Sequence, residues 1–215
     1  GSAFQSDPNP DYLEFLAGRI ADGIRRAHHN LAPATIGWGT GSEPSQVFNR
    51  RWKMKGGAKL VDPFGGTDQV RMNPPVASPD LDEPAGPIDP EVGVLAVRHA
   101  DGKPLALLAN YSLHYVGGTG PGDISGDYYG MFAQRVAQML DAADQDPPFV
   151  AMMSNGTSGN INNIDFRNAR QPLPPYAQMR IVAEALATVA VRVSREIEYR
   201  SQAKLAMREA PLRLG

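Results

Sequence analysis

Apolar residues recur at helical spacing near the start of the chain. Asn9 followed by Pro10 is typical of a helix N-cap with proline at the first helical position. The apolar residues that come next are spaced for one face of a helix: Leu13, Leu16, Ile20, Ile24 and Leu31. We therefore expect a helix over about residues 10–31.

Two apolar runs on either side of Asp101–Gly102 predict a β-hairpin within residues 91–114. An Asp-Gly pair readily adopts the positive φ angles of a tight hairpin turn. The second run is apolar at every position from 105 to 109, which favours a strand buried on both faces. His114 stands at the carboxyl end of this predicted strand.

The same patterns predict the remaining elements. We expect a short strand at 33–41, a helix at about 126–143, a buried strand at 148–154, a helix at about 174–199 and a final strand within 203–214. The proline-rich segment 62–90 has little periodicity, so we expect a long surface excursion there. Strands alternating with helices predict an α/β fold, in which the hairpin makes the β-sheet mixed and helices flank it.

Composition narrows the function without identifying it. The 215 residues, 42% of them hydrophobic, suffice for one domain over 1–215. A net charge of −2 without a basic block argues against nucleic acid or a polybasic membrane contact. The chain has no cysteine for disulfides or thiolate metal sites, and no apolar window suits a transmembrane helix.

Two polar loops are the strongest candidates for chemistry, because each follows a predicted strand. Ligands of open α/β sheets bind beyond the carboxyl ends of the strands. One loop follows His114, and the other, 155–160, follows Ser154. His114 is suited to be a metal ligand or a general base, and equally suited to be a core histidine bonded to backbone.

Smaller motifs allow two interpretations each. Ser125 is best explained as a helix cap, whereas Asp127 suits either capping or the orientation of a histidine or a substrate hydroxyl. The loop "NGTSGN" is not the G-x-S-x-G elbow of serine hydrolases, so its glycines are expected to let backbone amides approach a ligand. Arg50 is suited to polarise a carbonyl, or to lie at the surface beside Arg51.

Four segments in this order resemble the catalytic domain of the neutral/alkaline, non-lysosomal ceramidase superfamily, in its bacterial ceramidase-like branch. They are "NRRW" (49–52), "DPEVGVLAVRHADGKPLALLANYSLHYV" (89–116), "SGDYYG" (125–130) and "MSNGTSGNINN" (153–163). The resemblance implies a zinc-dependent amidohydrolase whose metal-activated water attacks the amide of a ceramide-like lipid. It further implies export from the cytoplasm.

The resemblance also implies roles for individual residues. It assigns zinc binding to His114, catalysis to Arg50 and Asn162, substrate binding to Asn49, Gly156, Gly159 and Asn160, and a supporting role to Asp127. Two departures stand out. Asn160 and Asn162 occupy positions where characterised ceramidases carry aspartate and serine, so ceramide itself is not established as the substrate. The family's threonine-histidine-threonine-histidine segment, and its glutamate and tyrosine zinc ligands, have no equivalent in this chain.

We therefore expect an incomplete catalytic domain that binds no stoichiometric zinc and whose site is completed by polypeptide outside this chain. A non-catalytic domain that holds a sugar or other polyol is the first alternative. A serine hydrolase that uses Ser154 or Ser158 is the second, and the missing elbow makes it the weaker of the two.

Overall fold

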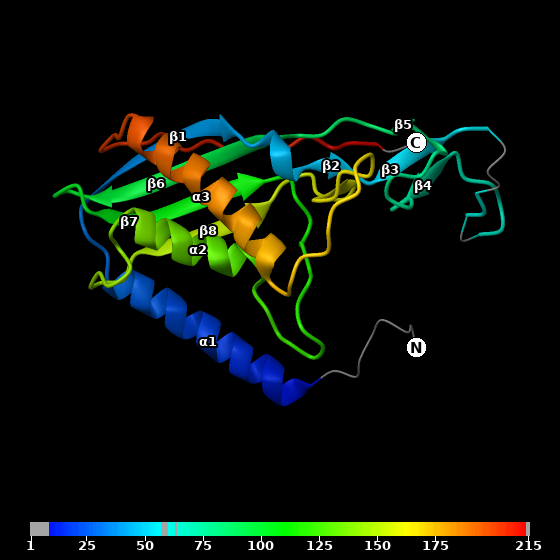
Figure 1. Ribbon diagram of the computed structural model, residues 1–215. Coiled ribbons are helices and arrows are strands. Elements are labelled where there is room, and N and C mark those ends of the chain that lie inside the picture. Colours follow the sequence, from blue (N-terminus) through cyan, green and yellow to red (C-terminus); the bar gives the residue numbers. More distant parts are fainter. Residues whose placement is uncertain (1–8, 57–59, 63, 214–215) are drawn as a thin grey trace. The chain divides into compact units, whose positions relative to one another are not determined.

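The computed structural model describes residues 9–56, 60–62 and 64–213 (Figure 1). The chain divides into two compact units, Gly1–Pro33 and Ala34–Gly215. In the first unit, helix α1 (Pro10–His29) begins as predicted, because the Asn9 side chain accepts a hydrogen bond from the Tyr12 amide at 3.0 Å. Arg26, His28 and His29 lie in its last turn, where positive charge is favourable.

A four-stranded mixed sheet forms the centre of the second unit. Its order is β1 (Ala34–Ser42), β6 (Glu91–His99), β7 (Pro104–Tyr111) and β8 (Val150–Asn155). β1 pairs antiparallel with β6, and β6 pairs antiparallel with β7, whereas β7 and β8 are parallel. The predicted hairpin is confirmed, since β6 and β7 pair and Gly102 at the turn has a φ of +88°. The mixed α/β architecture is thereby confirmed.

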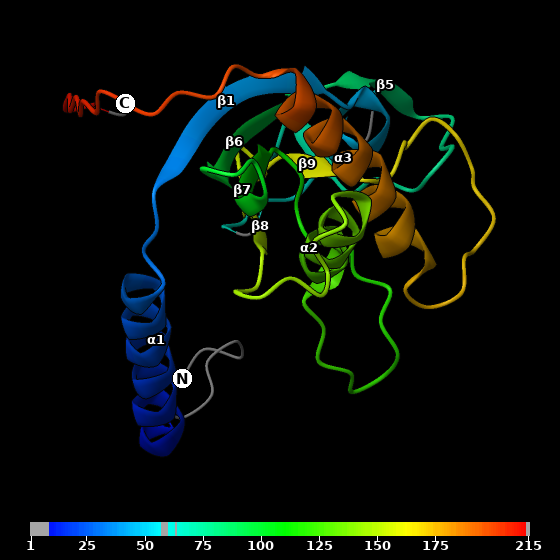
Figure 2. The ribbon, with the colours of Figure 1, turned by 90° about the vertical axis from the view of Figure 1, so that its left-hand side faces the viewer.

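Two helices cover one face of this sheet. Helix α2 (Asp127–Met139) packs on β8, α3 (Ala177–Glu196) packs on β1 and β6, and the two helices pack on each other. Figures 1 and 2 show both on the same side of the sheet. The core lies between these helices and the sheet. On the sheet side it is built from alternate strand residues, including Val92, Val94, Leu107, Ala109 and Tyr111.

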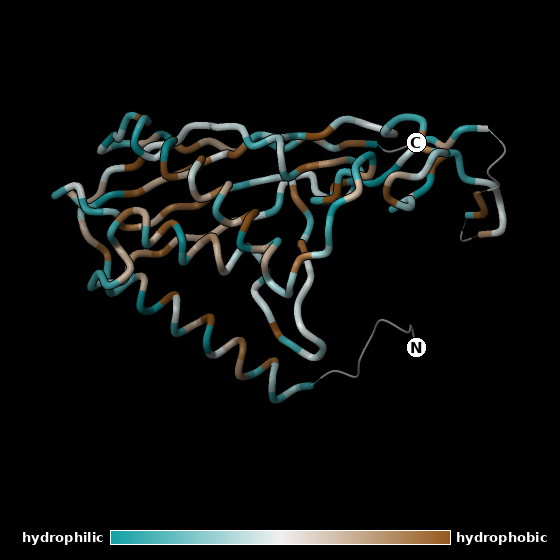
Figure 3. Tube along the Cα trace, viewed as in Figure 1, coloured by the Kyte–Doolittle hydropathy of each residue, from teal (hydrophilic) through white to brown (hydrophobic). Residues whose placement is uncertain are grey.

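The prediction that β7 is buried on both faces is wrong. Leu107 and Ala109 are buried beneath the helices, but Leu108 is 36% exposed on the opposite face. The prediction of a buried strand at 148–154 is wrong as well: in β8, Val150 and Met152 are each 48% exposed, and no residue of this strand is fully buried. Because both helices lie on one face, every second side chain of these strands points away from them. Figure 3 shows where hydrophobic residues lie along the chain.

Two small sheets organise the segments around the central one. Strand β3 (Arg51–Met54) lies between β4 (Val70–Met72) and β5 (Leu81–Pro84), so part of the predicted surface excursion is ordered as strand. The short 3₁₀ helix Pro44–Gln46 precedes β2 (Phe48–Asn49), which pairs with β9 (Ile161–Asn162). This second pairing joins two segments that are far apart in the sequence.

The predicted final strand is wrong for the described part of its range, 203–213. Arg200 makes an isolated bridge to Ile36, and no strand follows it there. Leu205 and Met207 are 90% and 84% exposed, so these apolar side chains are not packed into the core. Position 214 lies outside the described residues.

Within the described ranges, none of the helices is both long enough and apolar enough to cross a membrane.

Candidate functional site

The two candidate loops lie side by side at one edge of the central sheet. Strands β7 and β8 are parallel and in register, with Tyr111 opposite Asn155, so their carboxyl ends coincide. The Gly156 amide donates to the Tyr111 carbonyl at 2.9 Å directly after the strand pairing ends. The segment that carries His114 and the 155–163 loop are therefore neighbours, as expected from their positions after predicted strands.

The β2–β9 pairing brings the Asn49–Arg50 motif to the same loop. Asn49 pairs with Ile161, and the Arg50 amide donates to the Asn160 carbonyl at 2.8 Å. The Arg50 guanidinium donates from Nε and Nη2 to the Gly159 carbonyl, at 3.0 and 2.7 Å. Arg50 thus holds the loop in place through its side chain, and its role in catalysis stays a prediction.

A cavity of about 380 Å³ lies between this loop and the segment before β6. Three of the four predicted substrate-binding residues line it, namely Asn49, Gly159 and Asn160. The rest of the wall is formed by Gly86, Pro87, Ile88, Asp89, Thr157 and Ile161. The fourth predicted residue, Gly156, is not in this wall, and neither is Asn162, which pairs with Phe48.

Beneath the cavity, Ser112 links the two sides of the wall. Its hydroxyl is buried and lies 3.1 Å from Asp89 Oδ2, to which it donates, and 3.2 Å from Thr157 Oγ1. It also accepts a hydrogen bond from the Thr157 amide at 3.1 Å. Sequence reasoning missed Asp89, Ser112 and Thr157. The available signal was a serine two residues before His114, in a strand predicted to end at the site.

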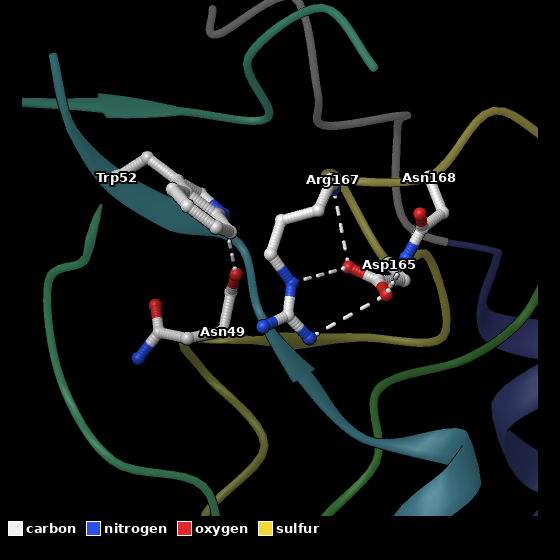
Figure 4. Close-up of polar contacts among 5 residues, drawn as sticks. All are labelled: Asn49, Trp52, Asp165, Arg167 and Asn168. Atoms are coloured by element: carbon white, nitrogen blue, oxygen red, sulfur yellow. Dashed lines mark hydrogen bonds and ion pairs between the residues drawn. The ribbon is translucent and has the colours of Figure 1, made fainter. Parts of the chain in front are cut away.

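Asn49 is itself buried and has a structural network of its own. Its carboxamide accepts from the Arg51 amide at 2.9 Å and donates to the Pro87 carbonyl at 3.3 Å. The Trp52 indole donates to the Asn49 carbonyl at 3.0 Å, as Figure 4 shows. These bonds fix the wall of the cavity at Asn49 and leave its side chain few free hydrogen-bonding positions.

Hydrogen bonds among Asp165, Arg167 and Asn168 close the loop that follows β9 (Figure 4). Asp165 accepts hydrogen bonds from the Arg167 amide and Nε, both at 3.1 Å, and from Asn168 Nδ2 at 2.7 Å. Burial acts to raise the pKa of Asp165, but the hydrogen bonds from Arg167 and Asn168 outweigh it and lower this pKa. The carboxylate therefore stays ionised and keeps the loop folded back on itself.

The two candidate glycines of the 155–160 loop differ in what surrounds them. A Cβ at Gly156 would lie 2.5 Å from Ser112 Oγ and 3.1 Å from Asn110 Oδ1. Gly156 thus permits a close approach between two chain segments, whereas the sequence suggested room for a ligand. A Cβ at Gly159 would meet nothing within 4 Å, and this glycine lines the cavity.

Strand β7 ends at Tyr111, so His114 follows the strand by three residues, whereas the sequence predicted it at the strand's end; it is partly buried. Its ring packs against Tyr115 with a centroid separation of 4.3 Å. In the part of the chain that the structure describes, no three histidine, cysteine, aspartate or glutamate side chains are grouped so that they could hold a metal ion. These residues by themselves therefore do not fit a zinc site, which takes three or four protein ligands.

Asp127 lies at the start of α2, and its carboxylate accepts the amides of Val116 at 3.0 Å and Gly117 at 2.8 Å. It therefore binds the backbone just after His114. The Ser125 hydroxyl accepts the Asp127 amide at 3.0 Å, in keeping with the predicted capping. Ser154, a nucleophile in the second alternative, instead has its hydroxyl bonded to Asn110 Nδ2 at 2.8 Å.

The fold is similar to that of part of two solved structures. One similar structure is the neutral ceramidase from Pseudomonas aeruginosa, at 19% identity and a TM-score of 0.56, over 82% of this chain and 25% of that one. Another is a ceramidase complexed with C2, at 17% identity and a TM-score of 0.53, over 80% of this chain and 24% of that one. This chain thus spans about a quarter of their length. No family model and no curated protein matches it.

Proposed function

We propose that this chain is part of the catalytic domain of a hydrolase that cleaves the amide bond of a ceramide-like lipid. The observation that supports this most directly is the meeting of three sequence motifs at one sheet edge. The Asn49–Arg50 pair, the 155–163 loop and the segment after β7 that carries His114 all come together there. The similarity of fold to ceramidase structures also supports the proposal.

The proposal includes zinc, although the described residues of this chain do not form a zinc site. In it, His114 supplies one ligand, and polypeptide beyond this chain supplies the others. When bound, zinc would lower the pKa of a coordinated water and so provide a nucleophile. The 215-residue chain alone is then expected to bind no stoichiometric zinc.

A second candidate function is the binding of a sugar or other polyol without catalysis. The composition of the cavity wall favours it. The wall offers the Asn160 carboxamide, the Thr157 hydroxyl and the Asp89 carboxylate, and none of the described residues that line it carries a positive charge. Such a wall suits neutral hydroxyl groups and gives no support to an anionic ligand.

An assay of short-chain ceramide hydrolysis by the full-length protein tests both proposed functions. We expect fatty-acid release, measured by mass spectrometry, that a chelator abolishes and added zinc restores. His114→Ala should abolish release, whereas His99→Ala, a matched change at the end of the neighbouring strand β6, should not. Turnover that resists the chelator would contradict the zinc proposal. Absent turnover together with saturable polyol binding would favour the second function.

A further inference from the structure

The face of the central sheet that α2 and α3 leave open carries a row of apolar side chains. Paired residues of neighbouring strands point to the same face, so they form rows across the sheet. One row consists of Trp38, Leu95, Leu108 and Met152, which pair in this order across β1, β6, β7 and β8. These residues are 54%, 37%, 36% and 48% exposed, so apolar surface faces outward on all four strands.

A second apolar row lies beside the first. Its members, two residues away on each strand, are Ile36, Val97, Ala106 and Val150. We call the two rows together the open face. None of its eight residues is charged. The Arg200 guanidinium lies 5.5 Å from the centre of the Trp38 ring, at the β1 edge of the open face.

On the side of the candidate site, the open face is continued by a row without charge. This row consists of Thr40, Gly93, Asn110 and Ser154. Asn110 Nδ2 donates to Ser154 Oγ at 2.8 Å, so two of its polar side chains bond each other. The next residue of β8, Asn155, begins the 155–163 loop. Uncharged surface therefore extends to the sheet edge at which the candidate loops meet.

This pattern differs from that of a sheet face that water covers. In an antiparallel sheet with one solvated face, polar residues normally alternate with apolar ones, so that the solvated face is polar. Here the strands carry apolar residues on both faces, and α2 and α3 cover one of them (Figures 1 and 2). A sheet that is apolar on both faces is typical of a structure with a further layer on the second face.

The size of the open face bears on what covers it. With four strands about 4.8 Å apart, and with the uncharged row included, three rows about 7 Å apart cover about 400 Å². Each partner in a stable complex usually buries about 800 Å², so two copies of the chain would gain little from this face alone. A layer from the same polypeptide needs less, because its effective concentration is high.

The similar structures have room for such a layer, since this chain matches only 25% and 24% of their length. We propose that in the full-length protein the open face packs against an apolar, uncharged layer formed by polypeptide beyond this chain. This inference rests on the part of the proposed function in which the chain is one portion of a larger catalytic domain.

Cysteine labelling tests the proposal, because the 215-residue chain has no cysteine of its own. Met152→Cys places a thiol on the open face. Ile181→Cys is the matched control, since Ile181 is 46% exposed on α3, in the layer that covers the other face. Modification by a maleimide is followed by mass spectrometry of the peptide that holds the new cysteine, in the 215-residue chain and in the full-length protein.

In the 215-residue chain, the two thiols should react at rates within about threefold of each other. In the full-length protein, Met152→Cys should react at least about 10-fold more slowly than in the short chain, because a covered thiol reacts only when the structure opens. The rate of Ile181→Cys should be the same in both. Should Met152→Cys fail to fold, Val150→Cys replaces it, at the same 48% exposure on the same strand.

Equal rates for Met152→Cys in the short and full-length chains would overturn the proposal. Sedimentation of the 215-residue chain tests a second copy as the occupant. A dimer that Leu108→Lys dissociates, with the Met152→Cys thiol protected in that dimer, would assign the open face to self-association and also overturn the proposal. Protection of this thiol in a monomeric 215-residue chain would do the same, because the chain would then cover the face itself.

The labelling result and the proposed function can fail separately. If the full-length protein hydrolyses no ceramide, the proposed hydrolase is refuted, and the labelling rates still show whether further polypeptide covers the open face. If hydrolysis is found and the Met152→Cys rates are equal, only the inference about the open face fails.

Discussion

Alanine at Gly156 tests how closely the 155–163 loop approaches strand β7. The added Cβ would lie 2.5 Å from Ser112 Oγ, 3.1 Å from Asn110 Oδ1 and 3.4 Å from Ser112 Cα. The first distance is far below ordinary contact. Ser112 Oγ has little freedom to move away, because it is buried and bonded to Asp89 and Thr157. The φ of Gly156 is not in the left-handed region, so the cost of alanine is steric.

The expected loss follows from overpacking and from the bonds of Ser112. Overpacking a well-packed site costs about 1–3 kcal/mol. Displacing the Ser112 hydroxyl would weaken its hydrogen bonds, each worth about 1 kcal/mol. We therefore expect Gly156→Ala to lower the free energy of unfolding by about 2–4 kcal/mol. Gly159→Ala is the matched control, and with open space around it should change stability by less than about 0.5 kcal/mol.

Urea denaturation followed by circular dichroism measures both changes. A double-mutant cycle with Ser112→Ala adds the decisive comparison. Without Ser112 Oγ the closest contact is gone, so Gly156→Ala should cost at least about 1 kcal/mol less in that background. The reasoning is refuted if Gly156→Ala and Gly159→Ala have equal effects, or if the cycle is additive within about 0.5 kcal/mol.

Four further outcomes are expected. Elemental analysis of the 215-residue chain should find no stoichiometric zinc, and one zinc per chain that is lost in His114→Ala would contradict this. Arg50→Gln removes both side-chain bonds to the Gly159 carbonyl and should speed amide hydrogen exchange in the 155–163 loop, with exchange in α3 unchanged. Phe132→Ala empties a fully buried core position and should cost about 3–5 kcal/mol in urea denaturation, a cost that a surface position would not show. Burial raises the pKa of Tyr128 above the ordinary value of 10.0, so its neutral form stabilises the fold below pH 10. The free energy of unfolding should therefore fall as pH rises above 10. Tyr128→Phe should show a shallower fall between about pH 10 and 11.

Much of the architecture could be predicted because its signals are local. Asn9 caps α1 within one turn of helix, and Gly102 supplies the positive φ of the hairpin turn. The placement of His114 shortly after β7 follows from the same hairpin. The parallel pairing of β7 with β8, which sets the two candidate loops side by side, agrees with the α/β pattern. The capped helix start and the hairpin turn depend on the dihedral angles and periodicity of a few neighbouring residues.

What the sequence by itself determined was therefore the longer elements, their order and the two polar loops that follow β7 and β8. Only the tertiary structure decided that both helices cover the same face, which leaves Leu108 exposed despite its continuously apolar run. It also decided that β2 pairs with β9, which brings Asn49 beside Asn160, and that Asp89 joins the cavity through Ser112. Pairings between distant segments depend on packing and hydrogen bonds summed over the whole unit, and no local pattern of residues encodes them.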